Sequence, residues 1–173
     1  VNKLKGIVML HIPRSGRLKD PVNIAQLMEI EEKYPDLKLI VAHIGRAYAP
    51  EDIGNAFEIL KNTKNMMFDF SANTLAEAME QCIIAVGPKR IMFGTDMPIA
   101  KMRMRRITKD GKYYNIVPKG LYGDVSDDWH MIETENEQLT NFTYEQLRAF
   151  IKAANNTGLT KNNINDIFFG NAA

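Results

Sequence analysis

The chain has 173 residues, enough for one domain with a sizeable core, and its hydrophobic (45%) and charged (25%) residues stand in the usual globular balance. A net charge of +1 excludes a strong electrostatic attraction to nucleic acid or to an anionic membrane, so we expect neither as a partner. The single cysteine, Cys82, excludes an intrachain disulfide. It lies in an apolar stretch, where we expect a buried structural thiol, and it fits a reducing, cytoplasmic compartment.

Four nearly continuous apolar runs predict four β-strands, over residues 6–12, 37–42, 66–70 and 90–93. Runs of this kind are typical of strands that are buried on both faces of a parallel sheet. The first strand begins within a few residues of Val1, whereas a domain usually has some lead-in before its first core strand. We therefore expect a further segment of the parent protein upstream of Val1.

Each of the first three strands is followed by a predicted helix. Asp20 is a suitable N-cap for the first helix, and Pro21 stands at the first helical position, which tolerates proline. The second helix is expected to begin at Pro50, and Thr74 is expected to cap the third. The alternation of strand and helix at a period of about 30 residues predicts a parallel α/β architecture, either an open doubly wound sheet or a (β/α)₈ barrel.

The regular pattern stops after the fourth strand. Residues 99–142 show no periodicity and are expected to form a long loop insertion, in which the basic cluster 101–106 is balanced by acidic residues of 124–137 in an internal salt-bridged loop. Two terminal helices are predicted: the first is capped by Thr143 and ended by residues 155–158, and the second covers residues 162–169. The sequence therefore predicts one domain with three parts: four βα strand units over 1–98, the insertion over 99–142, and terminal helices over 143–173.

Three polar residues stand directly after predicted strands: His11 after the first, His43 after the second and Asp96 after the fourth. Parallel strands that lie side by side bring their carboxyl ends to one edge of the sheet, where ligands bind in both architectures. Two imidazoles and a carboxylate are ligands that zinc and related ions prefer, and a metal there generates a hydroxide nucleophile near neutral pH. Asp96 is then a candidate proton acceptor. The alternative is that the histidines are ordinary hydrogen-bonding residues and that Asp96 caps a turn.

Several residues beside these three are further candidates. Arg14 and Arg17 follow His11 on one loop, and Arg46 follows His43; these arginines are candidate clamps for a substrate carboxylate, or else solvated loop charges. Other polar residues are candidates for hydrogen bonding to substrate or for covering the site, against the alternative of turn formation or a surface aromatic cluster: Ser71, Asn73 and His130.

Three sequence motifs resemble those of the amidohydrolase superfamily, and in particular of amidohydrolase family 2: LIVAHIGRAY, RIMFGTDMP and the terminal IFFGNAA. The resemblance implies that the four strands are strands 5 to 8 of a (β/α)₈ barrel, so that the chain is the C-terminal half. It implies that His11 and Asp96 are metal ligands, and that His43 either binds a second metal or polarises substrate and water. The expected metal is zinc, with manganese as the alternative. The family's strand-1 His-x-His motif is expected upstream of Val1.

The function that follows is a metal-dependent hydrolase, with His43 and Asp96 as catalytic residues, acting on a small ester, lactone or amide that carries a carboxylate. Alternatives are a non-oxidative decarboxylase of the same family and a half-barrel that performs no chemistry. A doubly wound domain for a phosphorylated ligand is disfavoured, because no glycine-rich phosphate loop follows any strand. Half a barrel leaves two open sheet edges, which predicts a homo-oligomer or pairing with the missing N-terminal half.

Overall fold

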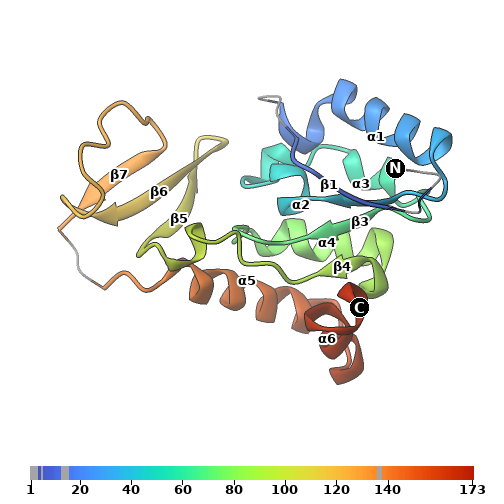
Figure 1. Ribbon diagram of the computed structural model, residues 1–173. Coiled ribbons are helices and arrows are strands. Elements are labelled where there is room, and N and C mark those ends of the chain that lie inside the picture. Colours follow the sequence, from blue (N-terminus) through green and yellow to red (C-terminus); the bar gives the residue numbers. More distant parts are fainter. Residues whose placement is uncertain (1–3, 5, 13–15, 136–137) are drawn as a thin grey trace.

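Four parallel strands form the main sheet of the computed structural model, which describes residues 4, 6–12, 16–135 and 138–173. The strands are β1 (Ile7–Leu10), β2 (Lys38–Val41), β3 (Met67–Asp69) and β4 (Ile91–Met92), and they lie in the order β1-β2-β3-β4 (Figure 1). The predicted strands, their parallel pairing and their shared carboxyl edge are therefore confirmed. All four are shorter than the apolar runs that predicted them.

One face of this sheet packs against the helices α1 (Pro21–Lys33), α3 (Ala56–Leu60) and α4 (Ala76–Val86). The first helix begins as predicted, because the Asp20 side chain accepts a hydrogen bond from the Val22 N–H at 2.8 Å. The helix predicted from Pro50 is interrupted. A 3-10 turn over Pro50–Asp52 is separated from α3 by Gly54, whose φ of 55° is left-handed. The third helix begins two residues later than its predicted Thr74 cap.

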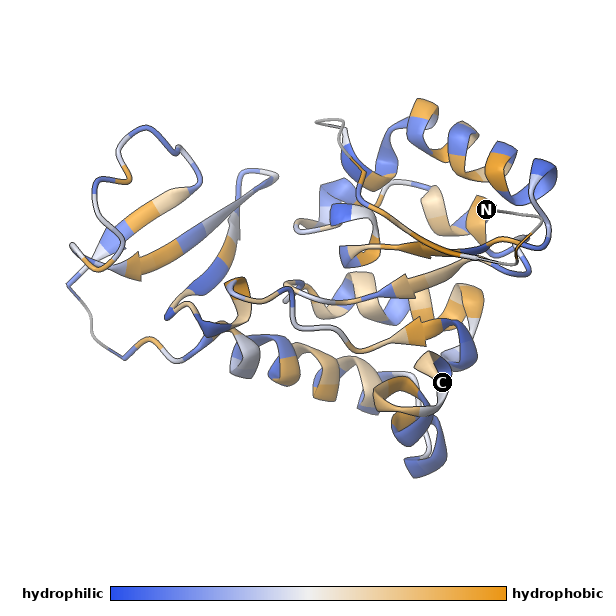
Figure 2. Cartoon of the chain, viewed as in Figure 1, coloured by the Kyte–Doolittle hydropathy of each residue, from blue (hydrophilic) through white to orange (hydrophobic). Residues whose placement is uncertain are grey.

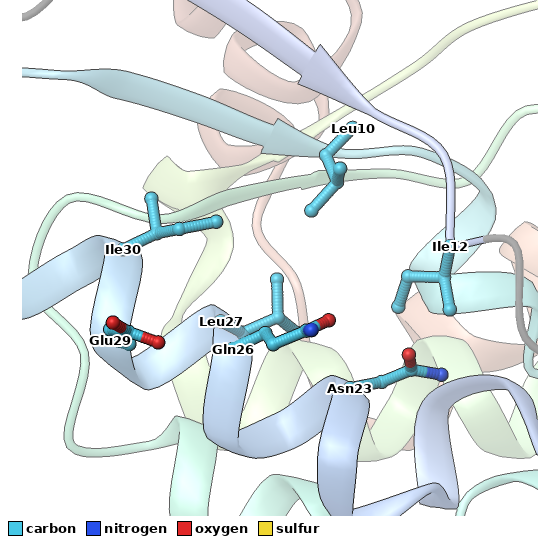
Figure 3. A pocket seen from close by; sticks show the side chains of 7 residues that line it. All are labelled: Leu10, Ile12, Asn23, Gln26, Leu27, Glu29 and Ile30. Carbon is cyan, nitrogen blue, oxygen red and sulfur yellow. The ribbon is translucent and has the colours of Figure 1, made fainter.

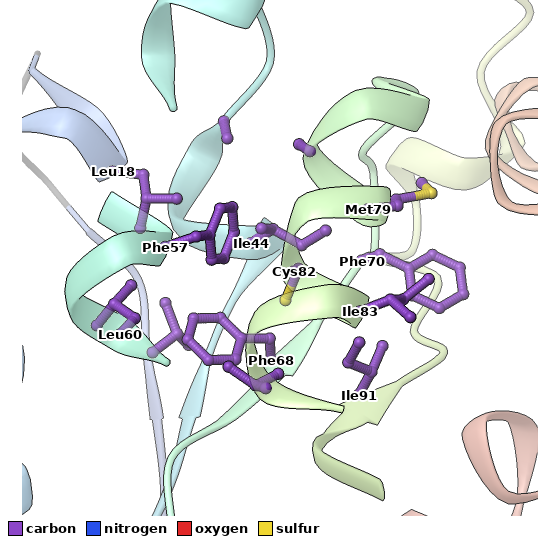
Figure 4. Packing of buried hydrophobic residues seen from close by; sticks show 14 of the residues in the cluster. Leu18, Ile44, Phe57, Leu60, Phe68, Phe70, Met79, Cys82, Ile83 and Ile91 are labelled. Atoms are coloured by element: carbon purple, nitrogen blue, oxygen red, sulfur yellow. The ribbon is translucent and has the colours of Figure 1, made fainter. Parts of the chain in front are cut away.

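The core lies between this sheet face and the helices (Figure 4). Leu39, Val41 and Phe68 come from the strands, and Phe57 from α3 packs edge-to-face against Phe68 with ring centroids 6.4 Å apart. Cys82 of α4 is fully buried among them, and burial raises the pKa of its thiol. The predicted role of Cys82 as a buried structural thiol is confirmed.

The opposite face of the sheet is not covered along β1. Ile7 and Met9 are 65% and 66% exposed, whereas Val8 and Leu10, which alternate with them, pack against the core. Figure 2 shows the hydrophobic character of this strand, which lies at the edge of the sheet. The expectation that every strand is buried on both faces is therefore wrong for β1, because no element of the described chain packs on that side.

A second, three-stranded sheet occupies most of the segment that was expected to be a long loop. It contains β5 (Arg105–Lys109), β6 (Lys112–Pro118) and β7 (Met131–Thr134); β5 pairs with β6 antiparallel, and β6 with β7 parallel. Asp110 and Gly111 join β5 to β6 with φ values of 51° and 71°. Two positive φ angles characterise the tight turn of a two-residue hairpin, for which Asp-Gly is a favoured sequence. The loop expectation missed this hairpin because it considered helical and βα periods alone.

The chain ends with α5 (Phe142–Asn156) and α6 (Lys161–Phe168), close to the predicted bounds; in Figure 1, α5 runs beneath the parallel sheet towards the second sheet. Phe150 of α5 stacks on Phe70 with centroids 4.9 Å apart, which fixes the helix against the end of β3. Asn171 donates hydrogen bonds to the carbonyls of Pro88 and Ile91, both at 2.7 Å, and so ties the C-terminus to β4. Among the described helices none is long and apolar enough to cross a membrane.

Candidate functional site

A cavity of about 510 Å³ lies at the carboxyl end of the parallel strands, on the sheet face opposite the helices. His11, His43 and Asp96 all line it, so the structure brings together the three residues that the sequence analysis selected. The lining includes apolar side chains, and its complete set of residues is Met9, His11, Ile40, Ala42, His43, Asp69, Ser71, Met92, Phe93, Gly94, Thr95, Asp96 and Ala172.

His11 follows β1 and is exposed. Its ring meets the His43 ring edge-on, with centroids 5.2 Å apart and planes at 80°. Partial burial of the ring lowers the pKa of His11, and the neighbouring His43 and the positive charge of Arg46 lower it further, while the carboxylates of Asp96 and Asp69 act in the opposite direction. The environment therefore favours the neutral imidazole, which is the form that binds a metal.

His43 begins a turn in which four successive residues, His43 to Arg46, have φ between 50° and 63°. A left-handed turn costs roughly 1–2 kcal/mol for each residue other than glycine. Burial offsets this cost, because the Ile44 side chain is 1% exposed and inserts into the core (Figure 4). Position 45 requires glycine for two reasons: its φ is left-handed, and a Cβ there would lie 2.6 Å from Cδ1 of Leu18. Strained backbone that its surroundings hold in place is common at functional sites.

The hydrogen bonds of His43 fix its tautomer. Nδ1 lies 2.8 Å from the carbonyl oxygen of Ser71 and 2.9 Å from its Oγ. Because a carbonyl oxygen only accepts, Nδ1 carries the proton and donates it. This leaves the other ring nitrogen, Nε2, as the atom that can bind a metal, and the His43 ring lines the cavity.

Asp69, at the end of β3, organises this part of the site. Its Oδ1 accepts hydrogen bonds from the backbone N–H of His43 at 3.2 Å, from the N–H of Ser71 at 2.9 Å and from the Ser71 hydroxyl. Its Oδ2 is buried and has no hydrogen-bond partner within the described structure. Buried polar atoms without a partner are rare and call for an explanation, such as an ion or a water molecule. Asp69 was not among the predicted site residues, although a carboxylate inside the apolar run MMFDF is a signal that can be recognised in the sequence.

Asp96 lies at the other side of the cavity, after β4. It is exposed, and its φ of 52° is left-handed. Within the described residues, no group of three or more His, Cys, Asp or Glu side chains is arranged so that it could hold a metal ion. The three selected residues thus share one cavity without forming a complete coordination sphere.

The predicted arginines lie elsewhere. Arg14 is outside the described residues. Arg17 forms an ion pair with Asp52, at 3.0 Å, and Nη1 of Arg46 donates to the carbonyl of Ile12 at 3.2 Å. Arg17 and Arg46 line a neighbouring cavity of about 500 Å³ rather than the one with the histidines.

Asn73 and Ser71 have structural roles near the cavity. Asn73 is fully buried; its Nδ2 donates to the carbonyls of His43 and Ala47, at 3.2 and 2.9 Å, and its Oδ1 accepts from the N–H of Leu75. Asn73 therefore holds the left-handed turn, and Ser71 holds the ring of His43. For both residues the structure favours the alternative of a local structural role.

His130 stands over the second cavity. Its ring stacks on Tyr113 with centroids 4.0 Å apart, and its Nδ1 lies 3.0 Å from the Tyr113 carbonyl oxygen, to which it donates. Trp129 lies directly beside it. The residue belongs to an aromatic cluster that borders the cavity of Arg17 and Arg46.

Arg106, from the basic cluster, departs from the expected salt-bridged loop. Its guanidinium lies over the rings of Tyr48, Tyr113 and Phe142, at 4.3, 4.9 and 4.8 Å from their centroids. Its hydrogen bonds run to Oδ1 of Asn115 and to the carbonyl of Ala72, at 2.9 and 2.6 Å. Burial lowers the pKa of this guanidinium. Arg106 therefore joins the second sheet to the loop after β3 instead of pairing with the acidic stretch.

A third, smaller cavity of about 210 Å³ opens between β1 and α1 (Figure 3). Leu10 and Ile12 from the strand side face Leu27 and Ile30 from the helix. The surface is mainly aliphatic and lies beside the edge strand, so we regard it as a packing surface and not as a site of chemistry.

The family model described as "Amidohydrolase" matches residues 1–173. The chain belongs to the amidohydrolase family. The resemblance noted in the sequence, carried by the His43 and Asp96 motifs, is thereby confirmed. No curated protein sequence matches the chain at a significant level.

Two solved structures with TM-scores of 0.50 or more support the same fold for this chain. A 4-oxalomesaconate hydratase from Rhodopseudomonas palustris is similar with a TM-score of 0.51 and 18% identity, over 99% of this chain and 45% of that one. A 2,6-dihydroxybenzoate decarboxylase from Rhizobium has a TM-score of 0.50 and 16% identity, over 99% and 51%. A Polaromonas dihydroxybenzoic acid decarboxylase, which holds bound manganese and an inhibitor, has a TM-score of 0.49 and 18% identity, over 99% and 50%. The chain thus spans about half the length of these proteins.

Proposed function

We propose that this amidohydrolase is a metal-dependent hydrolase that activates water to cleave a small ester, lactone or amide carrying a carboxylate. In this proposal His11, His43 and Asp96 bind the metal, and His43 and Asp96 also take part in catalysis. The observation that carries the proposal is the fixed tautomer of His43, which leaves Nε2 as the atom that can bind a metal, on a ring that lines the same cavity as His11 and Asp96.

The donor chemistry suits a divalent ion. Two imidazoles and the carboxylates of Asp96 and Asp69 form the mixed nitrogen and oxygen set that zinc accepts, with manganese as the alternative. The unpaired, buried Oδ2 of Asp69 is consistent with a nearby cation. Since the described residues do not complete a coordination sphere, further ligands are expected from outside them. When bound, such an ion supplies a water of lowered pKa.

The protein's own residues provide the remaining functions. Asp96 is exposed and lines the cavity, where its carboxyl group is placed to accept a proton from an attacking water. His43 cannot release its Nδ1 proton without losing its hydrogen bond to Ser71, so Nε2 is the atom that binds the ion or, in the alternative role, orients water or substrate. Arg46 belongs to the turn that begins at His43, and with Arg17 it is the candidate partner of the substrate carboxylate.

We further propose that the four parallel strands are half of a (β/α)₈ barrel, corresponding to strands 5 to 8. The exposed face of β1 and the aliphatic groove between β1 and α1 support a missing neighbour at this edge. Either a second copy of the chain or the N-terminal half of the barrel would cover these surfaces. Sedimentation equilibrium tests the first possibility, because a monomer at high concentration would contradict self-association.

Non-oxidative decarboxylation is the second candidate reaction. The lining of the cavity includes the apolar side chains of Met9, Ile40, Met92 and Phe93. An apolar surface disfavours a charged carboxylate relative to neutral carbon dioxide, which is the direction that decarboxylation requires. Product analysis separates the two reactions: a hydrolase consumes one water for each bond cleaved and releases no carbon dioxide, whereas a decarboxylase releases carbon dioxide.

Metal titration of the purified chain tests the proposed function. We expect saturable binding of zinc or manganese in isothermal titration calorimetry, weakened more than about tenfold by His11→Ala or Asp96→Ala, since each removes a ligand. His130→Ala is the matched control, because this histidine lies on the other cavity. Absence of saturable binding, or an equal loss in the His130 variant, would contradict the proposed site and leave a half-barrel that performs no chemistry.

A further inference from the structure

The second cavity lies where the two sheets of the molecule meet. The parallel-sheet part contributes Arg17, Lys19, Arg46 and Asp52, and the hairpin and the loop after it contribute the opposite wall, including Lys112 and His130. Its volume of about 500 Å³ falls within the range of small-molecule sites. The segment that looked like an irregular insertion thus forms one wall of a pocket beside the proposed active site.

The cavity carries an excess of positive charge. Arg17, Lys19, Arg46 and Lys112 border it, whereas Asp52 is the one carboxylate in its lining. Asp52 is already engaged, because its Oδ2 accepts from Arg17 at 3.0 Å and from the N–H groups of Tyr48 and Ala49 at 3.2 and 3.0 Å. Within the described part of the chain, the other three cations form no ion pair. The side chain of Glu51 packs against Gly111 at the border of the cavity, but three cations without an ion-pair partner outnumber this one carboxylate. Their excess charge creates a potential that attracts a multiply charged anion.

Arg106 adds a further positive charge below the pocket. It lies over the Tyr113 ring, as does Arg17, whose guanidinium is 4.5 Å from the ring centroid. Arg106 makes its hydrogen bonds to neutral groups, the Asn115 amide and the Ala72 carbonyl, and the Asp96 carboxylate acts on its charge without a hydrogen bond between them in the described structure. Two guanidinium groups held near one ring repel each other, and an anion in the cavity would reduce that repulsion.

The hairpin wall is aromatic. The rings of Tyr113 and His130 stack with planes 10° apart, and Trp129 continues the cluster beside His130. Trp129 remains 56% exposed. Lys112 lies over the indole, with Nζ 5.4 Å from its centroid. A planar ligand can stack on such a wall, while the basic residues opposite bind acidic groups at its rim.

We propose that this cavity is a recognition subsite for a planar organic anion with two or more acidic groups, and that the β5–β7 sheet supplies its selectivity through Lys112, Trp129 and His130. Arg46 connects the subsite to the cavity of His11, because Arg46 lines the subsite and its positive charge acts on His11. The claim that this anion is part of the substrate rests on the proposed function. The claim that the cavity binds the anion does not depend on it.

Trp129 is the only tryptophan of the chain, so its fluorescence reports directly on this cavity. The probe is benzene-1,3,5-tricarboxylate, titrated in the presence of EDTA so that no metal contributes. We expect saturable quenching, weaker binding of propane-1,2,3-tricarboxylate, which has the charges without the ring, and weaker binding of benzoate, which has the ring with one charge. Rising salt should weaken the binding. Equal affinity for all three anions, or no saturable change, would overturn the proposal.

A pair of variants separates local recognition from general attraction. Lys112→Gln is expected to weaken tricarboxylate binding about five- to tenfold. Lys109→Gln removes the same charge from the residue opposite Lys112 in the hairpin register, outside the cavity lining, and should leave the affinity nearly unchanged. Equal losses in both would overturn the subsite.

Metal binding and anion binding can be tested independently of each other. His11→Ala and Asp96→Ala should preserve tricarboxylate binding, and Lys112→Gln should preserve metal binding. Loss of metal binding alone would therefore count against the proposed function, and loss of anion binding alone against this inference.

Discussion

The two cavities of the molecule are built in different ways. The first is held by buried groups: Asp69 and Asn73 fix a left-handed turn, and the turn fixes His43. The second is bordered in part by two exposed lysines, Lys19 on a 3-10 turn and Lys112 on the hairpin. Groups that perform chemistry need a fixed geometry, whereas groups that recognise a charged ligand can adapt. From this difference we infer that residues of the parallel sheet determine the type of reaction and that residues of the second sheet determine substrate selectivity.

The largest expected effect comes from Asp69→Ala. This change leaves the N–H groups of His43 and Ser71 and the Ser71 hydroxyl without their buried acceptor, so we expect a loss of about 3 kcal/mol in the free energy of unfolding. Lys112→Gln, in the other cavity, should change it by less than about 0.5 kcal/mol, as is usual for surface residues. Urea denaturation measures both. Similar losses in the two variants would remove the contrast between the cavities.

Gly45→Ala tests the left-handed turn with a smaller expected effect. The added Cβ would lie 2.6 Å from Leu18 Cδ1 and 3.1 Å from Ile12 Cδ1, at a φ of 61°. We expect a loss of about 2 kcal/mol in unfolding free energy, together with weaker metal binding, because His43 belongs to the same left-handed turn as the glycine. Gly120→Ala is the control, since it has a similar φ of 70° and open space around it. An equal loss there would assign the effect to φ alone.

Sequence patterns predicted the parts of the structure that follow regular rules. The four strands, their shared edge and the placement of His11, His43 and Asp96 follow from apolar runs and from the geometry of parallel sheets. The Asp20 cap also follows from a local rule. The family motifs add the expectation of a metal, which donor chemistry alone leaves open.

Long-range contacts were beyond the reach of those patterns. Asp69 lies in an apolar strand, but only the folded structure shows that its carboxylate binds the backbone of His43, 26 residues earlier. Arg106 looked like one charge of a salt-bridged cluster, and its insertion among three rings depends on how the hairpin packs on Tyr48. The assignment of Arg17 and Arg46 to a separate cavity depends on the same packing.

The smallest expected effect concerns the protonation of His130. Burial of its ring lowers the pKa, the Tyr113 carbonyl raises it, and the charge of Arg17 lowers it further. The unfolded chain therefore takes up this proton near pH 6.5, whereas the folded chain takes it up only at lower pH. The stability that neutral His130 contributes is complete above pH 6.5 and falls as the pH drops towards the folded pKa.

NMR titration of the His130 ring protons, in EDTA, measures this shift. We expect a midpoint below that of an unstructured peptide, and a rise of the midpoint when benzene-1,3,5-tricarboxylate is added, because an anion in the cavity favours the protonated ring. Arg17→Gln should also raise it, by removing a neighbouring positive charge. A midpoint at or above the peptide value would contradict the positive character of the second cavity. The tricarboxylate therefore tests whether the two cavities act independently. If it raises the titration midpoint of His130 and leaves the metal affinity at His11 unchanged, recognition and chemistry are separable within one fold.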